Sequence, residues 1–216
     1  MIRAVIFDLD GTVLNTLDTI TYYVNDTLEK LGRPTLTRDD CRRMVGNGAR
    51  LLLERALAAT GGLTPALYDE ASALYNGAYN AAPLYLTAPY PGILSLLRVL
   101  RERGVRVGIL SNKPEGATVP LVRQVLGDLV DVVHGGREGI PLKPDPAACL
   151  AMVEELGVTP AELLYVGDSE VDIHTGNAAR AACTVGVLWG FRDRETLIAA
   201  GAEHLVSTPE EILNYL

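Results

Sequence analysis

The order of hydrophobic and polar positions divides the chain into two kinds of region. Residues 4–7 are a short apolar run, Ala-Val-Ile-Phe, which is typical of a strand covered on both faces. From residue 16 to residue 86 the apolar positions recur at helical spacing, so we expect helices over residues 16–31, 37–45, 51–59 and 64–81, and no strand. After residue 87, apolar runs alternate with helical segments, which predicts right-handed βαβ units and a parallel sheet with helices on both faces.

We therefore expect an α/β protein with two domains. Residues 1–15 and 87–216 would form the core, a Rossmann-like, doubly wound parallel sheet, and residues 16–86 an all-helical cap domain inserted after the first strand. A chain of 216 residues is long enough to bury a sizeable hydrophobic core. In an open sheet of this kind the ligand crevice lies outside the carboxyl ends of the strands, where the strand order switches.

Polar side chains follow several of the predicted strands directly. They are Asp8 and Asp10 after residues 4–7, Ser111 and Asn112 after residues 105–110, and Asp168 and Asp172 after residues 163–166, while Lys143 opens the helix after another strand. Alternation along a strand places Asp8 and Asp10 on the same side of the sheet, roughly 6–7 Å apart. Two carboxylates that close raise each other's pKa unless a cation lies beside them. A polar loop often caps one strand, but four such segments at one edge favour a site.

The residue types at this edge suit a hard divalent cation and an anion. Mg²⁺ prefers carboxylate and carbonyl oxygens together with substrate phosphate oxygens, and Asp8 and Asp168 could share it. Lys143 and the backbone amides around Thr12 and Asn112 could bind phosphoryl oxygens, where phosphoryl transfer needs its charge neutralised. The chain has no GxxxxGK[ST] loop, so nothing supports ATP hydrolysis through a P-loop.

These segments resemble the four ordered motifs of the haloacid dehalogenase-like hydrolase superfamily. The motifs are Asp8-Leu-Asp10-Gly-Thr12, Ser111-Asn112, Lys143-Pro144, and Gly167-Asp168-Ser169 with Asp172, and the resemblance covers nearly the whole chain. Within that superfamily the helical insertion, the segment 45–57 and the segments 186–190 and 200–204 resemble the phosphoglycolate phosphatase subgroup. The resemblance implies hydrolysis of a small phosphomonoester, with 2-phosphoglycolate the favoured substrate and Mg²⁺ the cofactor.

The resemblance also implies a role for each motif residue. Asp8 would be the nucleophile and form an aspartyl-phosphate, and Asp10 would be the general acid and base, a role worth about 10²–10⁴-fold in rate. A second carboxylate at the position of Asp10 argues against the dehalogenase branch of the superfamily.

The same resemblance assigns the remaining ligands. Asp8, Asp10 through its main-chain carbonyl, and Asp168 would bind Mg²⁺, and Asp172 would be an outer ligand or an orienting partner of Lys143. Ser111 and Lys143 would bind the transferred phosphoryl group, with Thr12 and Asn112 as further phosphate contacts.

The inserted cap is expected to close over the crevice and read the leaving group. Asn47 and Arg50 are the candidate reading residues, since an Arg can pair with a substrate carboxylate in fork geometry. A solvated Arg at a helix start is the alternative. Asn15 departs from the family pattern, in which this hinge position frequently carries Asp, and the change bears on cap geometry more than on chemistry.

The charge and the cysteine content of the chain restrict its expected partners and cellular location. A formal net charge of -8 without a run of Lys or Arg argues against nucleic-acid binding. Three scattered cysteines with no CxxC spacing indicate neither disulfides nor zinc. We find no signal-peptide pattern and no apolar stretch of membrane-spanning length, and so expect a cytoplasmic protein without membrane partners. A monomer or a homodimer is expected; Tyr75, Tyr79 and Tyr85 could form the cap core or a dimer patch.

Two other functions use similar residues. A sugar-phosphate mutase of the β-phosphoglucomutase type shares the core and cap, although residues 16–31 contain only one basic residue, Lys30. A phosphoacceptor signalling domain also combines an acidic pair, a hydroxyl and a lysine, but would not turn over. The length of this chain and its helical insertion argue against a signalling domain.

Overall fold

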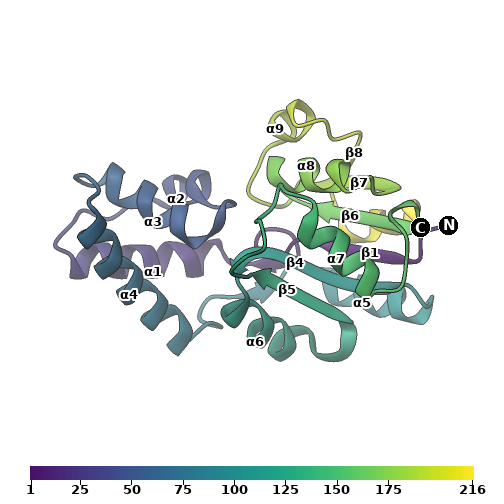
Figure 1. Cartoon of the computed structure of the whole chain (residues 1–216), viewed down its shortest axis with the longest axis horizontal. Coiled ribbons are helices and arrows are strands. Elements are labelled where there is room, and N and C mark those ends of the chain that lie inside the picture. Colours follow the sequence, from purple (N-terminus) through teal and green to yellow (C-terminus); the bar gives the residue numbers. More distant parts are fainter. The chain divides into compact units, whose positions relative to one another are not determined.

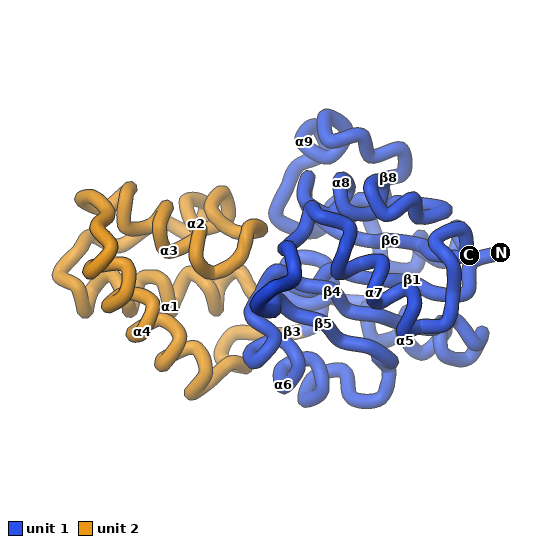
Figure 2. The backbone as a smooth tube through the Cα atoms, in the orientation of Figure 1, with its two compact units in different colours: residues 1–15, 89–216 blue, residues 16–88 orange.

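The computed structural model describes residues 1–216 and divides into two compact units. One unit, the core, comprises residues 1–15 and 89–216, and the other comprises residues 16–88 (Figure 2). The chain thus returns to the core at residue 89, whereas the sequence pattern places the return at residue 87.

A six-stranded parallel sheet forms the centre of the core (Figure 1). Its strands are β1 (Ala4–Phe7), β4 (Arg106–Pro114), β5 (Val132–Gly136), β6 (Leu163–Gly167), β7 (Cys183–Val187) and β8 (His204–Val206), in the spatial order β5-β4-β1-β6-β7-β8. The chain passes from β1 to β4 and β5 on one side and returns to β6 on the other side of β1. The strand order therefore switches around β1, and the predicted α/β fold with a doubly wound parallel sheet is confirmed.

The apolar run of β1 lies in the interior of this sheet. All four of its side chains are fully buried, and its residues pair with β4 on one side and β6 on the other, with Ala4 opposite Arg106 and Leu163. A strand covered on both faces needs no polar alternation, which explains its continuous hydrophobic sequence. Asp8 and Asp10, which follow β1, therefore begin from a rigidly held strand end.

Helices cover the sheet, and their close approach is set by small residues in the strands. The core helices are α5 (Ile93–Glu102), α6 (Glu115–Leu126), α7 (Ala147–Glu155), α8 (Glu170–Ala178) and α9 (Arg194–Ala199). In α7, Cys149 and Met152 pack into one buried cluster with Ile6 of β1. A Cβ atom at Gly108 would lie 2.5 Å from the Met152 sulfur, so a larger residue at this strand position would force the Met152 side chain to move.

Several core elements differ from the expected boundaries. The strand β4 continues past Leu110 to Pro114, with a register irregularity between these two residues in its pairing with β5. Short elements such as β8 and α9 were not expected, because three to six residues are too few for a periodic pattern to stand out.

Four helices make up the second unit, as the sequence pattern predicts. They are α1 (Leu17–Lys30), α2 (Arg38–Met44), α3 (Gly48–Ala59) and α4 (Pro65–Ala81). Thr37 and Asp40 form a capping box at the start of α2, and Thr64 accepts a hydrogen bond from the Leu67 amide at the start of α4. Tyr75 and Tyr79 of α4 are buried within the unit, whereas Tyr85 is exposed.

A short ribbon was missed by the sequence pattern. Strands β2 (Leu14–Asn15) and β3 (Ala88–Pro89) pair as a two-stranded sheet at the two points where the chain passes between the units. Two residues are too few to show strand alternation. Asn15, the position that departs from the family pattern, lies in this ribbon.

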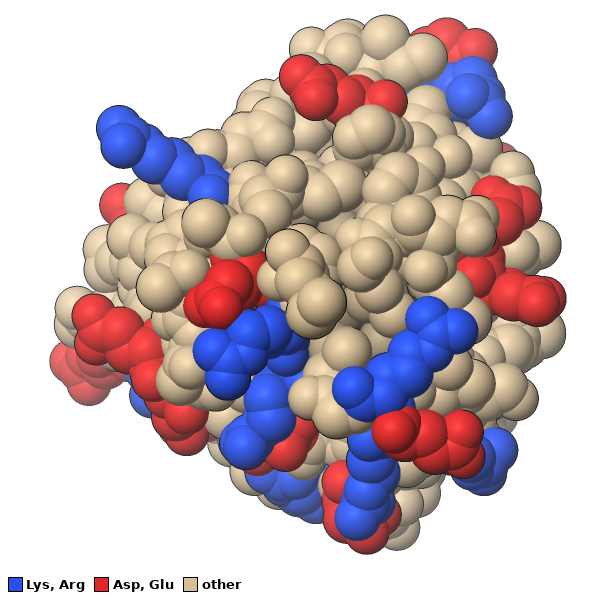
Figure 3. All heavy atoms as spheres, turned by 90° about the vertical axis from the view of Figure 1, so that its right-hand side faces the viewer, with Lys and Arg blue, Asp and Glu red and all other residues tan.

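Charged side chains of both signs share the face that carries the two chain termini. Figure 3 shows Lys and Arg side chains gathered on one part of this face with Asp and Glu side chains among them.

The helices of the chain are all too short or too polar to cross a membrane.

Candidate active site

The carboxyl end of β1 places Asp8 at the centre of the site. The Asp8 backbone amide continues the strand by donating a 2.9 Å hydrogen bond to the Val166 carbonyl of β6. Its side chain lies next to residues that follow β6 and to the loop before α7, because the carboxyl ends of parallel strands share one edge. The strand order thus brings together the segments that the sequence pattern selected.

Lys143 joins two of the carboxylates. Its Nζ donates hydrogen bonds of 2.7 Å to Asp8 Oδ1 and 2.7 Å to Asp172 Oδ1. The three side chains are between 1% and 10% exposed. Burial raises the pKa of Asp8 well above its usual value, and the neighbouring carboxylates add to this, while Lys143 opposes it. Burial disfavours the charge on Lys143, but Asp172 and Asp8 outweigh it and raise the Lys143 pKa, so the ammonium stays charged.

The side chain of Asn112 fixes the backbone of Lys143. Asn112 Nδ2 donates to the Lys143 carbonyl at 3.0 Å, and the Lys143 amide donates to Asn112 Oδ1 at 2.8 Å. This pair of hydrogen bonds ties the end of β4 to the loop that carries the lysine. The side chain of Asn112 therefore positions Lys143, and its assignment as a phosphate contact stays a prediction that concerns its backbone amide.

Asp168 is held by contacts from two other segments. Thr12 Oγ1 donates to Oδ1 at 3.1 Å, and the Phe191 amide donates to Oδ2 at 2.7 Å. Burial and then the charge of Asp172 raise the pKa of Asp168 to about 7, against the lowering effect of these hydrogen bonds. Thr12, a predicted phosphate contact, is thus fully buried with its hydroxyl on this carboxylate.

Two glycines leave room for the Asp168 carboxylate. A Cβ atom at Gly11 or at Gly190 would overlap the Asp168 side chain. Gly11 also has a φ of 95°, a conformation that side chains other than glycine rarely adopt. The tight loop after Asp10 and the loop after β7 therefore require glycine at the positions that flank Asp168.

Asp172 has a double role at the start of α8. Its Oδ2 accepts hydrogen bonds from the Ser169 amide at 3.1 Å and the Ser169 hydroxyl at 2.6 Å, which forms a capping box. Its Oδ1 accepts from Lys143. Asp172 thus acts as a partner of Lys143, which is one of the two roles that the sequence motif implies.

The three buried carboxylates form a group that could hold a metal ion. Oxygen atoms of Asp8, Asp168 and Asp172 lie within 4.8 Å of one another. The Lys143 ammonium pairs with two of them, Asp8 and Asp172, so when all three carboxylates are ionised the group carries excess negative charge that a divalent cation would balance. Hard oxygen donors without sulfur or imidazole fit Mg²⁺.

Asp10 lies beside a second lysine, Lys113, which is not one of the predicted site residues. Lys113 Nζ donates to Asp10 Oδ1 at 3.3 Å, and its backbone amide donates to Ser111 Oγ at 3.2 Å. Ser111 is itself buried at the end of β4. Lys113 follows Ser111 by two residues, so in a continuous strand the two side chains would point to the same side of the sheet. The predicted strand ends at residue 110, and the sequence pattern therefore does not predict where the Lys113 side chain points.

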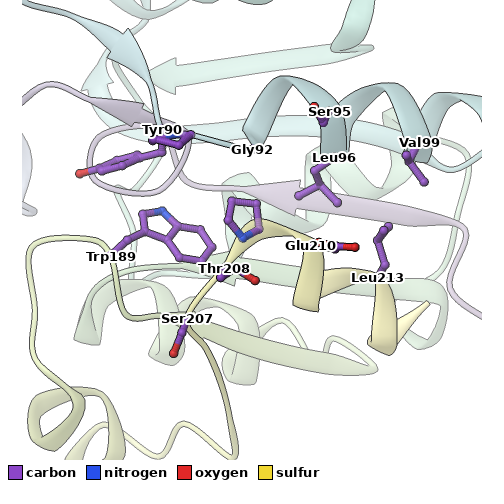
Figure 4. A pocket seen from close by; sticks show the side chains of 12 residues that line it. Tyr90, Gly92, Ser95, Leu96, Val99, Trp189, Ser207, Thr208, Glu210 and Leu213 are labelled. Carbon is purple, nitrogen blue, oxygen red and sulfur yellow. The ribbon is translucent and has the colours of Figure 1, made fainter.

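An apolar cavity of about 660 Å³ lies in the core, apart from the carboxylates (Figure 4). The Trp189 ring lines it, and the indole Nε1 donates to the Thr12 carbonyl at 3.0 Å. Residues from the start of α5 and from the C-terminal 3₁₀ helix (Pro209–Tyr215) complete the wall: Tyr90, Pro91, Gly92, Ser95, Leu96, Val99, Ser207, Thr208, Pro209, Glu210 and Leu213. None of the site carboxylates lines this cavity.

The two candidate reading residues of the second unit lie at the start of α3. Asn47 precedes the first turn, and Arg50 lies within it. Arg50 Nε pairs with Glu54 Oε1 at 2.8 Å, its guanidinium lies 5.6 Å from the Tyr68 ring centre, and its side chain is 77% exposed. Their role in reading a leaving group stays a prediction.

Comparison with known proteins identifies the family. Residues 2–180 match the family described as hydrolase, haloacid dehalogenase-like hydrolase. A phosphoglycolate phosphatase from Pseudomonas putida is 40% identical over 195 residues, which are 88% of this chain and 70% of the relative. A phosphoglycolate phosphatase from Rhodospirillum rubrum is 39% identical over 208 residues, 94% of this chain and 86% of the relative.

A solved structure supports the same conclusion. It is that of a candidate phosphoglycolate phosphatase from Lactobacillus delbrueckii subsp. bulgaricus, with a TM-score of 0.93 and 31% identity over 99% of this chain and 97% of that chain. The chain therefore belongs to the haloacid dehalogenase-like hydrolases. The predicted family membership, with its resemblance to phosphoglycolate phosphatases, is confirmed.

Proposed function

We propose that the protein is a Mg²⁺-dependent phosphomonoester hydrolase that acts through an aspartyl-phosphate on a small phosphorylated metabolite, with 2-phosphoglycolate the favoured substrate. The observation that carries this proposal is the buried Asp8, which is hydrogen-bonded to Lys143 and grouped with two further carboxylates at the switch in strand order. Such a cluster can hold a phosphoryl group and balance its charge.

In the first half of the reaction, Asp8 attacks the phosphorus atom. A bond forms between an Asp8 carboxylate oxygen and phosphorus, the bond from phosphorus to the alkyl oxygen breaks, and Asp10 gives its proton to that oxygen. Lys143 lies beside Asp8 and neutralises charge on the phosphoryl oxygens, and the Ser111 hydroxyl binds one of them.

In the second half, water releases the phosphate. Asp10, now deprotonated, takes a proton from a water molecule while the oxygen of that water bonds to phosphorus. The bond from phosphorus to Asp8 breaks. Asp8 and Asp10 are thereby restored, and the products are the alcohol and inorganic phosphate. A single carboxyl group can serve as acid and then as base because each half-reaction leaves it in the state that the next one needs.

The residues that would hold Mg²⁺ are Asp8, Asp168 and the main-chain carbonyl of Asp10, with Asp172 as an outer or indirect contact. When bound, the ion supplies positive charge that offsets charge developing on the phosphoryl oxygens. Thr12 and the Phe191 amide keep Asp168 oriented for this task.

The substrate assignment is supported by relatives that are themselves phosphoglycolate phosphatases. We further propose that residues 16–86 act as the cap domain and that Asn47 and Arg50 contribute to reading the leaving group. Opening the Arg50 pair with Glu54 would release the guanidinium for a substrate carboxylate.

The test is phosphate release from a panel of small phosphomonoesters, with Mg²⁺ and with EDTA. We expect many turnovers per enzyme with Mg²⁺ only, and the highest kcat/KM for 2-phosphoglycolate. Conversion of β-glucose 1-phosphate to glucose 6-phosphate without phosphate release would instead identify a mutase. Release of no more than one phosphate per protein would indicate a phosphoacceptor domain.

A further inference from the structure

The Lys113 ammonium has an unusual place in the core. Its Nζ lies 3.3 Å from Asp10 Oδ1, and the side chains of Lys113 and Asp10 are only 9% and 13% exposed. Lys143, which is buried, pairs with Asp8 instead. The two carboxylates of the first motif are therefore each accompanied by their own cation.

The backbone of Lys113 is fixed from several directions. Its amide donates to Ser111 Oγ, and its carbonyl accepts a 3.0 Å hydrogen bond from the hydroxyl of Thr118, which is fully buried in α6. On the β5 side, a Cβ atom at Gly135 would lie 2.7 Å from the Lys113 carbonyl oxygen. With its backbone held in this way and its side chain already enclosed beside Asp10, Lys113 loses little further freedom when it binds a ligand.

The position beside Asp10 has a specific meaning in the proposed reaction. Asp10 must contact the alkyl oxygen of the leaving group in order to protonate it. In a phosphorylated 2-hydroxy acid, the carboxylate is separated from that oxygen by a single carbon. A cation within hydrogen-bond distance of Asp10 is thus within reach of that carboxylate, whereas Lys143 faces the phosphoryl side.

We propose that Lys113 is a specificity-determining residue that binds an anionic group placed one carbon from the ester oxygen, as in 2-phosphoglycolate. This inference rests on the proposed function and goes further, because it adds a core residue to the cap residues proposed to read the leaving group. A charge-assisted hydrogen bond in a nearly dry site favours the anionic substrate over a neutral one of the same shape by roughly 10- to 100-fold.

The experiment compares 2-phosphoglycolate with its neutral amide, 2-phosphoglycolamide, which keeps the same heavy-atom skeleton. We measure kcat/KM for both substrates in the wild type and in Lys113→Gln, Lys113→Met and Lys113→Arg. The expected result is that Lys113→Gln and Lys113→Met lose roughly 10- to 100-fold on 2-phosphoglycolate and far less on the amide. Lys113→Arg keeps the charge and should recover part of the preference.

Lys30→Gln is the matched control, because Lys30 is a half-exposed lysine of α1 paired with Asp26. This variant should leave the ratio of the two kcat/KM values unchanged. Equal losses on both substrates in the Lys113 variants would show that Lys113 only positions Asp10, and would overturn the proposal. An inactive wild type would instead refute the proposed function itself, so the two failures are distinguishable. Melting temperatures identify any variant that fails to fold, and Lys113→Met and Lys113→Arg then decide the question.

Discussion

Asp8 and Asp10 are separated by one residue, yet they occupy different electrostatic environments. Asp8 is buried, hydrogen-bonded to Lys143 and close to Asp168 and Asp172, and its pKa is raised mainly by burial. Asp10 lies half-buried beside Lys113. Two carboxyl groups in unlike surroundings can take unlike roles, here a nucleophile and a proton carrier.

The nucleophilic role of Asp8 can be tested with an isosteric change. Asp8→Asn should lower phosphate release by about 10³-fold or more, because an amide cannot form the acyl-phosphate bond. The control is Asp128→Asn, which removes a carboxylate from a side chain that is 81% exposed and should leave the rate unchanged. Turnover by Asp8→Asn near the wild-type rate, in protein with a normal melting temperature, would contradict the assignment.

Gly190 offers a test of how Asp168 is placed. Gly190→Ala should lower activity strongly and weaken the stabilisation by Mg²⁺, because the added Cβ would overlap the Asp168 side chain. Gly77→Ala is the control, since a Cβ at this α4 position meets nothing within 4 Å. The measurements are the phosphatase activity and the Mg²⁺-induced rise in melting temperature of both variants. Equal activity and an equal rise in the two would show that Asp168 can move without loss of activity or metal binding.

At the scale of elements, the strands and helices with strong periodicity were predictable, and so were the residues directly after strand ends. Asp8, Lys143, Asp168 and Asp172 meet because parallel strands share one edge, which follows from the βαβ order alone. Lys113 could not be found in this way. The direction of its side chain depends on the irregular end of β4, and this irregularity lies in the pairing with β5, a tertiary contact.

The connection between β4 and the Lys143 loop gives a prediction of its own. Asn112→Ala removes two buried hydrogen bonds to the Lys143 backbone and should reduce kcat by roughly tenfold or more, with a loss of about 1–3 kcal/mol in unfolding free energy. The control is Asn76→Ala, which removes an exposed hydrogen bond to Ser72 in α4. Unchanged kcat in Asn112→Ala would mean that the lysine is held by its carboxylate partners alone.

At the scale of the whole molecule, the site concentrates negative charge in an already acidic protein of net charge -8. The Asp8 cluster holds three buried carboxylates and the Lys143 ammonium, which pairs with two of them, so ionising all three carboxylates without a bound cation brings like charges together. Protonation relieves this repulsion at low pH, and a bound divalent cation would relieve it at high pH. Proton binding and metal binding therefore compete, and the competition is measurable without any substrate.

The pKa of Asp168, raised to about 7 from the ordinary 3.8, sets the direction of this competition. A carboxyl group with a raised pKa in the folded state favours folding at low pH, and this contribution is lost as the pH rises from about 4 through 7. Above 7 the Asp168 carboxyl group is ionised, and Mg²⁺ no longer has to displace a proton from it. The rise in melting temperature on adding Mg²⁺ to EDTA-treated protein should therefore be larger at about pH 8 than at about pH 6. Asp168→Asn should show little rise at either pH. An equal rise at both pH values in the wild type, or a larger one at about pH 6, would contradict the assignment of Asp168 as a metal ligand.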